Sequence, residues 1–157
     1  MLTHLFRACL FFLLIGLHAC GPEYLYQGQQ PIAGGQWMYR DSAVFRFQVP
    51  DTSTRYDFFL DIEYDEAYPF QNLYLRLSTD YPNGRRLSKV MSFDLFDTQG
   101  EVLGKSASGH SRLRTPLQEN AYFNAAGQYS VTVAQHTRRD SLAGIKSIGL
   151  AVVRRKE

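Results

Sequence analysis

Residues 56–64 read YDFFLDIEY, and this stretch decides the class of fold. Its aromatic and aliphatic side chains occupy every second position from Tyr56 to Tyr64, and Asp57, Asp61 and Glu63 fall between them. A period of two places alternate side chains on opposite faces of a β-strand. We therefore predict a strand with one buried face and one solvated face.

The same alternation recurs along the chain and predicts an all-β protein. Turn-forming sequences such as Pro82-Asn83-Gly84 separate the alternating segments. No stretch keeps a period of 3.6, and only residues 117–124 and 140–144 are candidates for a helical turn. We expect a single antiparallel β-sandwich, jelly-roll-like, of about seven or eight strands, with a closed barrel as the lesser alternative. The predicted strands cover residues 45–49, 56–64, 73–77, 87–96, 112–117, 129–135 and 148–152.

The beginning of the chain predicts an exported lipoprotein. Arg7 precedes a short apolar run over residues 8–17, and the chain turns polar directly after Cys20. This layout is typical of a secretory signal peptide, and the run is too short for a membrane span, which needs about 20 apolar residues. Residues 17–20 (LHAC) resemble a bacterial lipobox, in which the cysteine is lipidated and becomes the mature N-terminus. His18 departs from that pattern, so a plain signal peptide or an uncleaved anchor is the alternative.

The chain behind this signal is of single-domain size. Removal of residues 1–19 as a signal peptide leaves 138 of the 157 residues. Residues 20–36 are rich in Gly, Gln and Pro without periodicity, and they predict a flexible tether that follows the lipidated Cys20. An extended segment packed along the domain is the alternative, because residues 24–26 are apolar. Residues 37–157 then form the β-sandwich domain.

Charge and cysteine content narrow the class of function. The formal net charge is +2, and loss of Arg7 with the signal peptide leaves +1, which predicts no binding to nucleic acid. Cys9 leaves with the signal peptide, so an acylated Cys20 leaves no thiol for a disulfide or a metal ion. We expect no cofactor.

Acidic side chains on the predicted strand 56–64 are the first candidate site. Their common parity places them on one face, where their oxygens could ligate calcium or serve a glycosidase. We favour a solvated strand face and expect no metal site. The four acidic residues are Asp57, Asp61, Glu63 and Asp65.

The remaining residues give little evidence for an enzyme. His110 and His136 are the only mature histidines, which is too few for a zinc site without carboxylates. No G-x-S-x-G nucleophile motif occurs. We therefore predict that the protein is not an enzyme, and an enzyme would require a deep pocket that joins one of these histidines to a carboxylate.

Several short motifs together resemble the GldH family of gliding-motility lipoproteins from Bacteroidetes. Their order covers the mature chain from about residue 20 to residue 153. The motifs are Trp37, Phe45-Arg46-Phe47, residues 68–75 (YPFQNLYL), residues 97–100 (DTQG), Leu103-Gly104, Gly127-Gln128-Tyr129, residues 142–145 (LAGI) and Ile148-Gly149-Leu150.

This resemblance implies a non-enzymatic lipoprotein of the cell envelope, with a fatty-acid anchor such as palmitate. Its implied partners are other envelope proteins of a gliding-motility or type IX secretion-associated assembly, and it supplies no catalytic residues. Gly21 is not the aspartate that retains many lipoproteins at the inner membrane, so we expect the outer membrane, facing the periplasm. A carbohydrate-binding or calcium-dependent module with the same fold is the alternative function.

Aromatic residues near one turn are the predicted partner contacts. Tyr68, Phe70 and Tyr74 lie close together in the sequence, and aromatic side chains concentrate the binding energy of protein interfaces. The alternative is that Tyr68-Pro69-Phe70 packs a corner of the sandwich.

Overall fold

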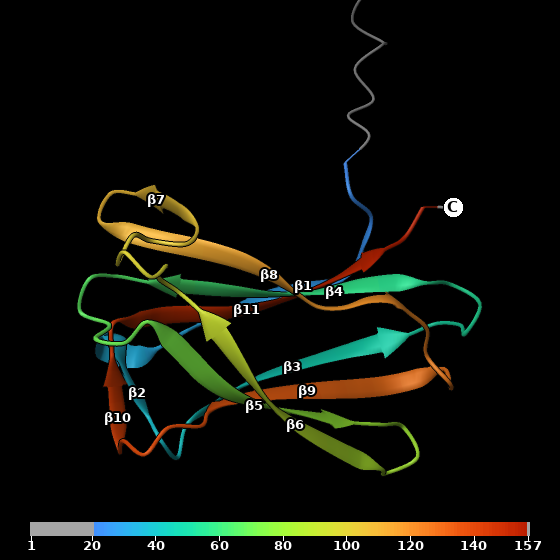
Figure 1. Ribbon diagram of the computed structural model, residues 1–157. Coiled ribbons are helices and arrows are strands. Elements are labelled where there is room, and N and C mark those ends of the chain that lie inside the picture. The colour runs from blue at the N-terminus through green and yellow to red at the C-terminus, as the bar shows by residue number, and fades with distance from the viewer. Residues whose placement is uncertain (1–20, 157) are drawn as a thin grey trace, which may run out of the picture.

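Two antiparallel sheets face each other in the computed structural model, which describes residues 21–156 (Figure 1). The first sheet has the strand order β1-β11-β4-β8-β7, and the second has the order β3-β9-β5-β6. A short pair, β2 and β10, adjoins them at one end. The long strands are β1 (Tyr24–Pro31), β3 (Ser42–Val49), β4 (Tyr56–Tyr64), β5 (Asn72–Asp80), β6 (Arg86–Asp94), β8 (His110–Ala121), β9 (Gly127–Gln135) and β11 (Ile145–Arg154). The short elements are η1 (Ala33–Gly35), β2 (Gln36–Met38), β7 (Lys105–Ala107) and β10 (Ser141–Ala143).

The eight long strands follow the order of a jelly roll. Counted along the chain, the first, eighth, third and sixth long strands lie side by side in the first sheet, and these are β1, β11, β4 and β8. The second, seventh, fourth and fifth long strands form the other sheet, and these are β3, β9, β5 and β6. Two Greek keys folded over each other give this interleaving. The structure therefore confirms the all-β class and the jelly-roll-like sandwich; of the eleven strands within residues 21–156 eight are long, and these include β1, which was not predicted.

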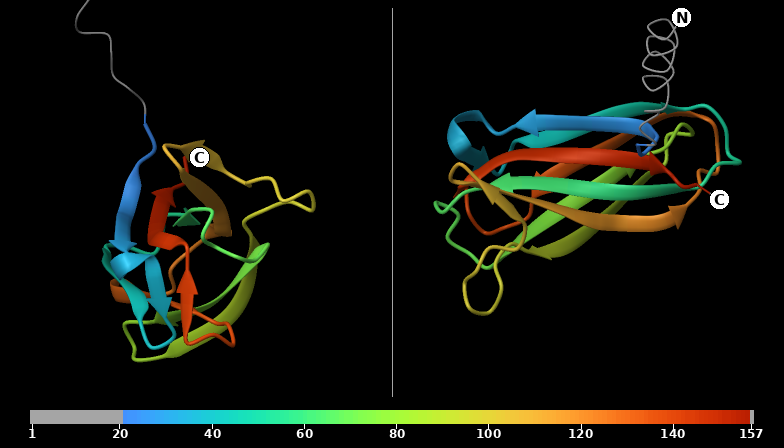
Figure 2. Two further views of the ribbon diagram at one scale, coloured as in Figure 1. Left: turned by 90° about the vertical axis from the view of Figure 1, so that its left-hand side faces the viewer. Right: turned by 90° about the horizontal axis from the view of Figure 1, so that it is seen from above.

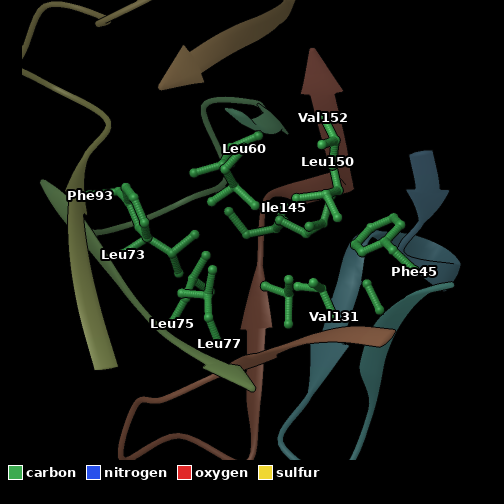
Figure 3. Packing of buried hydrophobic residues seen from close by; sticks show 14 of the residues in the cluster. Phe45, Leu60, Leu73, Leu75, Leu77, Phe93, Val131, Ile145, Leu150 and Val152 are labelled. Atoms are coloured by element: carbon green, nitrogen blue, oxygen red, sulfur yellow. The ribbon is translucent and has the colours of Figure 1, made fainter. Parts of the chain in front are cut away.

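The alternating side chains of the strands meet between the sheets and form the core. Leu60 and Ile62 of β4 are fully buried, as are Leu75 of β5 and Val133 of β9. Figure 3 shows Leu60 and Leu150 of the first sheet opposite Leu75, Leu77 and Val131 of the second. Burial of these apolar side chains is the main stabilising contribution in a chain of this size.

Strand β1 corrects the predicted tether, which is wrong for residues 24–36. β1 pairs with β11 from Tyr24 opposite Val153 to Pro31 opposite Ser147. The ring centroid of Tyr26 lies 5.3 Å from that of Phe47. The segment is ordered because its backbone completes the open edge of β11 and its aromatic residues cover the second sheet. Polar composition concealed this: Gln27 and Gln29 are exposed, whereas the half-buried Gln30 side chain hydrogen-bonds the backbone of Val44 in β3.

The two predicted helical turns are strands instead. Residues 117–121 belong to β8, and residues 141–143 form β10. β10 pairs with β2 through Leu142 opposite Trp37, and both side chains are almost fully buried. Among residues 21–156, the only helical element is the three-residue turn η1, and none of their helices is long and apolar enough to span a membrane. The predicted signal peptide and Cys20 lie outside the described residues.

We predict that Tyr26→Ala lowers the free energy of unfolding by about 2 kcal/mol, because a half-buried ring is lost from the contact between β1 and β3. Chemical denaturation measures the change. Gln27→Ala on the same strand removes an exposed side chain and should change stability little. Equal stability of the two variants would show that β1 is not part of the folded unit.

Candidate functional site

An open hollow of about 600 Å³ lies at one end of the sandwich and contains all three predicted contact residues. We call it the aromatic hollow. Tyr39, Phe70 and Tyr74 expose between 37% and 48% of their surface. The full lining is Tyr39, Tyr68, Phe70, Asn72, Tyr74, His136, Thr137, Arg138 and Arg139.

The ring of Tyr68 is buried beneath this surface and is not accessible to solvent. Only 3% of Tyr68 is exposed, and its hydroxyl donates to the carbonyl oxygen of Asn72 at 2.7 Å. Burial raises the pKa of this hydroxyl well above its usual value. Its ring meets that of Phe70 edge to face, with centroids 5.8 Å apart. Tyr68 therefore packs a corner of the sandwich, whereas Phe70 and Tyr74 are accessible.

A glycine lets a second chain segment pass directly beneath Tyr68. Gly144 has a φ of +84°, and a Cβ atom at this position would lie 2.1 Å from the backbone nitrogen of Tyr68. Its carbonyl oxygen accepts the N–H of Asp65 at 2.9 Å. The step between β10 and β11 thus fixes the loop that carries Phe70.

The segment after β9 supplies the cationic side chains of the hollow. The guanidinium carbon of Arg139 lies 5.6 Å from the ring centroid of Phe70, within range of a cation–π interaction. Buried Gln135 donates from Nε2 to the carbonyl oxygen of Arg139 at 3.1 Å, which fixes this loop. Arg76 donates to Nδ1 of His136 at 2.8 Å, and the backbone N–H of His136 donates to the carbonyl oxygen of Tyr74.

This arrangement suits binding more than catalysis. Exposed rings, an amide and guanidinium groups can engage an acidic or amide-rich surface. No Asp or Glu is among the described residues that line the hollow, so His136 has no carboxylate partner there. His110 begins β8 and is not among the lining residues.

Sequence reasoning did not identify the residues that complete the hollow. Tyr39 follows β2, and residues 136–139 follow β9, so both segments are distant from Phe70 in the sequence. The pairing of β9 with β5 brings residues 136–139 to Tyr74. Arg138 and Arg139 form a basic pair in the sequence, but no sequence pattern links such a pair to a distant aromatic turn.

The acidic residues of β4 form ion pairs with neighbouring strands. Asp61 accepts two hydrogen bonds from Arg114 of β8, both at 2.7 Å, in a bidentate arrangement. Glu63 lies 3.4 Å from Arg112 of β8. The other two carboxylates lie at either end of the strand: Asp57 is 3.1 Å from Arg155, and Asp65 is 2.6 Å from Lys146.

Hydrogen bonds hold two of these carboxylates in the charged form. The Ser147 hydroxyl, donating at 2.9 Å, is the main cause of a lowered pKa of Glu63, with Arg112 adding to it. Lys146 lowers the pKa of Asp65 in the same way. Within residues 21–156 no group of three or more His, Cys, Asp or Glu side chains is placed to hold a metal ion.

A profile of the GldH lipoprotein family matches residues 24–152, from the start of β1 almost to the end of β11. This chain belongs to the GldH lipoprotein family. The matched range includes the aromatic hollow and the ion-paired face of β4. The resemblance to this family noted in the sequence is thereby confirmed.

The chain is similar to two relatives and to one solved structure. It is 26% identical over 149 residues to "Gliding motility lipoprotein GldH homolog" of Christiangramia forsetii, covering 90% of each chain. It is 23% identical over 144 residues to "Gliding motility lipoprotein GldH" of Flavobacterium johnsoniae, covering 87% of this chain and 88% of the relative. A cellulose-specific carbohydrate-binding module, CBM28, is 10% identical with a TM-score of 0.44, and covers 82% of this chain and 72% of its own. That likeness carries no functional argument.

We predict that Glu63→Gln makes the protein less sensitive to acid. The folded-state pKa of Glu63 lies below the ordinary glutamate value, so its contribution to stability is present above about pH 4.3 and is lost as the pH falls through the folded-state pKa. Melting temperatures measured from neutral to acidic pH should therefore fall less steeply in the variant. Glu66→Gln changes an exposed carboxylate and should follow the wild-type curve; a Glu63→Gln curve parallel to wild type would contradict the assignment.

Proposed function

We propose that this protein is a non-enzymatic, lipid-anchored component of the cell envelope that docks another protein of a gliding-motility or type IX secretion-associated assembly. The aromatic hollow is the proposed docking site. The observation that carries the proposal is the position of the hollow at the opposite end of the sandwich from the start of β1 and the end of β11. Figure 2 shows these two strand ends near each other.

Strand registers define these two ends. Tyr24 pairs with Val153, and Tyr56 pairs with both Arg154 and Ala121, so these residues lie at one end of the first sheet. Tyr64 pairs with Ile145 at the other end, from which the loop carrying Phe70 leaves. A strand of nine residues spans about 30 Å, which separates the two ends.

The link to the proposed anchor is short. The carbonyl oxygen of Glu23 accepts the N–H of Arg154 at 2.7 Å, and its carboxylate forms an ion pair with the same arginine. Glu23 is three residues after Cys20, and three residues span at most about 10 Å. Lipidation at Cys20 would therefore hold the end with the termini next to the lipid surface and turn the hollow away from it.

This orientation supports a docking role. Two or three acyl chains on one cysteine give stable anchoring where a single chain would be marginal. Phe70 and Tyr74 are then presented about 30 Å above the surface, beside the Arg139 guanidinium. The names of the two relatives, both gliding-motility lipoproteins, support the kind of assembly that we propose. We further propose the outer membrane, facing the periplasm, as the location.

We predict that labelled fatty acid is incorporated into the wild-type chain but not into Cys20→Ser, because the serine hydroxyl does not replace the thiol as the acylation site. Metabolic labelling followed by gel fluorography measures the incorporation. A folded but unlabelled variant separates the anchor from the fold. Equal labelling of the two chains would contradict the lipid anchor.

We predict that the double variant Phe70→Ala and Tyr74→Ala loses its envelope partner while it keeps the fold and the label. Both side chains are exposed, so their removal should cost little stability but at least tenfold in partner capture. Capture is measured by pull-down from solubilised membranes through a C-terminal tag, with bound proteins identified by mass spectrometry.

Tyr122→Ala is the matched control, because Tyr122 is an exposed ring just beyond Ala121, at the end with the termini. It should capture the partner as the wild type does. Equal loss in both variants would contradict the assignment of the hollow. Recovery of polysaccharide without envelope proteins would replace protein docking with carbohydrate binding.

A further inference from the structure

A second concavity opens between the two sheets along the edge formed by β6 and β8. Its volume is about 550 Å³, and it reaches core residues such as Leu150 and Val131. Leu87 and Met91 line it from β6, and Leu117 lines it from β8. We call it the sheet cleft. It does not share a lining residue with the aromatic hollow.

The sheet cleft exists because the inner face of β6 lacks a covering strand. In the register of β5 and β6, Leu77 pairs with Lys89 and Thr79 pairs with Leu87. Paired residues share a face, so Leu87 points toward the space between the sheets. Yet 51% of Leu87 is exposed. Apolar surface left open between sheets in this way is typical of a ligand site.

Lys89 is the one charged residue among those that line the cleft. It lies on the inner face beside Leu77 and Met91, and within residues 21–156 its ammonium group forms no ion pair or side-chain hydrogen bond. The buried part of the lining is apolar, whereas the polar lining residues Gln118, Asn120 and Asn124 are exposed. An apolar floor with one unpaired ammonium group at the opening matches a ligand that has a long apolar chain and a single negative charge.

The free edges of β6 and β8 border the cleft, and both are poorly suited to pair with an added β-strand. A charged side chain that points inward, such as Lys89, protects an edge strand from pairing with another chain. On β8, Pro116 lacks an N–H donor, and the register with β4 shifts at Phe58. An occupant that needs no backbone hydrogen bonds therefore fits better than a peptide.

We propose that the sheet cleft binds a long-chain fatty acid, with the alkyl chain between the sheets and the carboxylate at the ammonium group of Lys89. A volume of about 550 Å³ is within the range of small-molecule sites. The lining residues Ala121 and Tyr122 place one mouth of the cleft at the end with the chain termini. A fatty acid leaving the membrane next to the proposed anchor would meet this mouth first.

The test uses the full lipidated chain in nanodiscs of neutral phospholipid, with a photoreactive analogue of palmitic acid as the probe. We expect adducts on β6 and β8 that excess palmitate prevents and excess hexadecanol, which lacks the charge, prevents less well. Lys89→Gln should reduce adduct formation about threefold to tenfold, because an exposed ion pair contributes modestly to affinity. Mass spectrometry of peptides locates and quantifies the adducts.

Lys105→Gln is the matched control, because Lys105 is an exposed lysine on β7 outside the cleft. It should leave the adducts unchanged. Leu117→Trp, which fills the cleft from β8, should abolish them while capture of the envelope partner through the aromatic hollow persists. Adducts outside the cleft, or equal effects of Lys89→Gln and Lys105→Gln, would overturn the proposal without affecting the proposed docking role.

Discussion

The backbone ladder between β1 and β11 determines how the rest of the molecule is positioned. It joins the segment next to Cys20 directly to β11, an inner strand of the first sheet, so an anchor at that cysteine would act on a rigid body. The Glu23–Arg154 contacts continue this ladder to within three residues of the cysteine. The direction of the aromatic hollow and the position of the cleft mouth both follow from this pairing.

Strand β4 shows why an acidic strand face is poor evidence for a metal site. Each of its outward carboxylates meets a cation contributed by another strand or by the C-terminal segment, as Asp61 meets Arg114. Such pairs contribute little individually at a surface, but they offset the repulsion between neighbouring acids. The face joins three strands of the first sheet through their side chains as well as their backbones.

The fold was predictable because most of the long strands keep a period of two between apolar and polar residues. β4 is the clearest case, since Leu60 and Ile62 are buried and Asp61 and Glu63 point outward. β1 was missed because its side of the sheet is covered by only a few aromatic residues, and its glutamines gave the composition of a linker. β2 and β10 were missed because three residues are too few to display any period.

The candidate site was only partly predictable, for a reason of topology. Phe70 lies in the turn directly before β5 and Tyr74 lies on that strand, so their proximity follows from the sequence alone. Arg139 and Tyr39 join them through strand pairings that connect distant segments. No local signal encodes those pairings. The sequence left the burial of Tyr68 as one of two alternatives, because the segment packed against it begins at Gly144, far along the chain.

The interleaved order of the strands also has a consequence for how the protein is made. The first long strand pairs with the last, and β4 lies between β8 and β11, so the first sheet closes only when nearly the whole chain is present. Contacts between such distant segments carry a large loop-closure entropy and make folding slow. A chain that crosses a membrane from its N-terminus would expose Cys20 to modifying enzymes well before the sandwich forms. Acylation would then act on an unfolded chain, and the anchor would be in place before the domain that it holds.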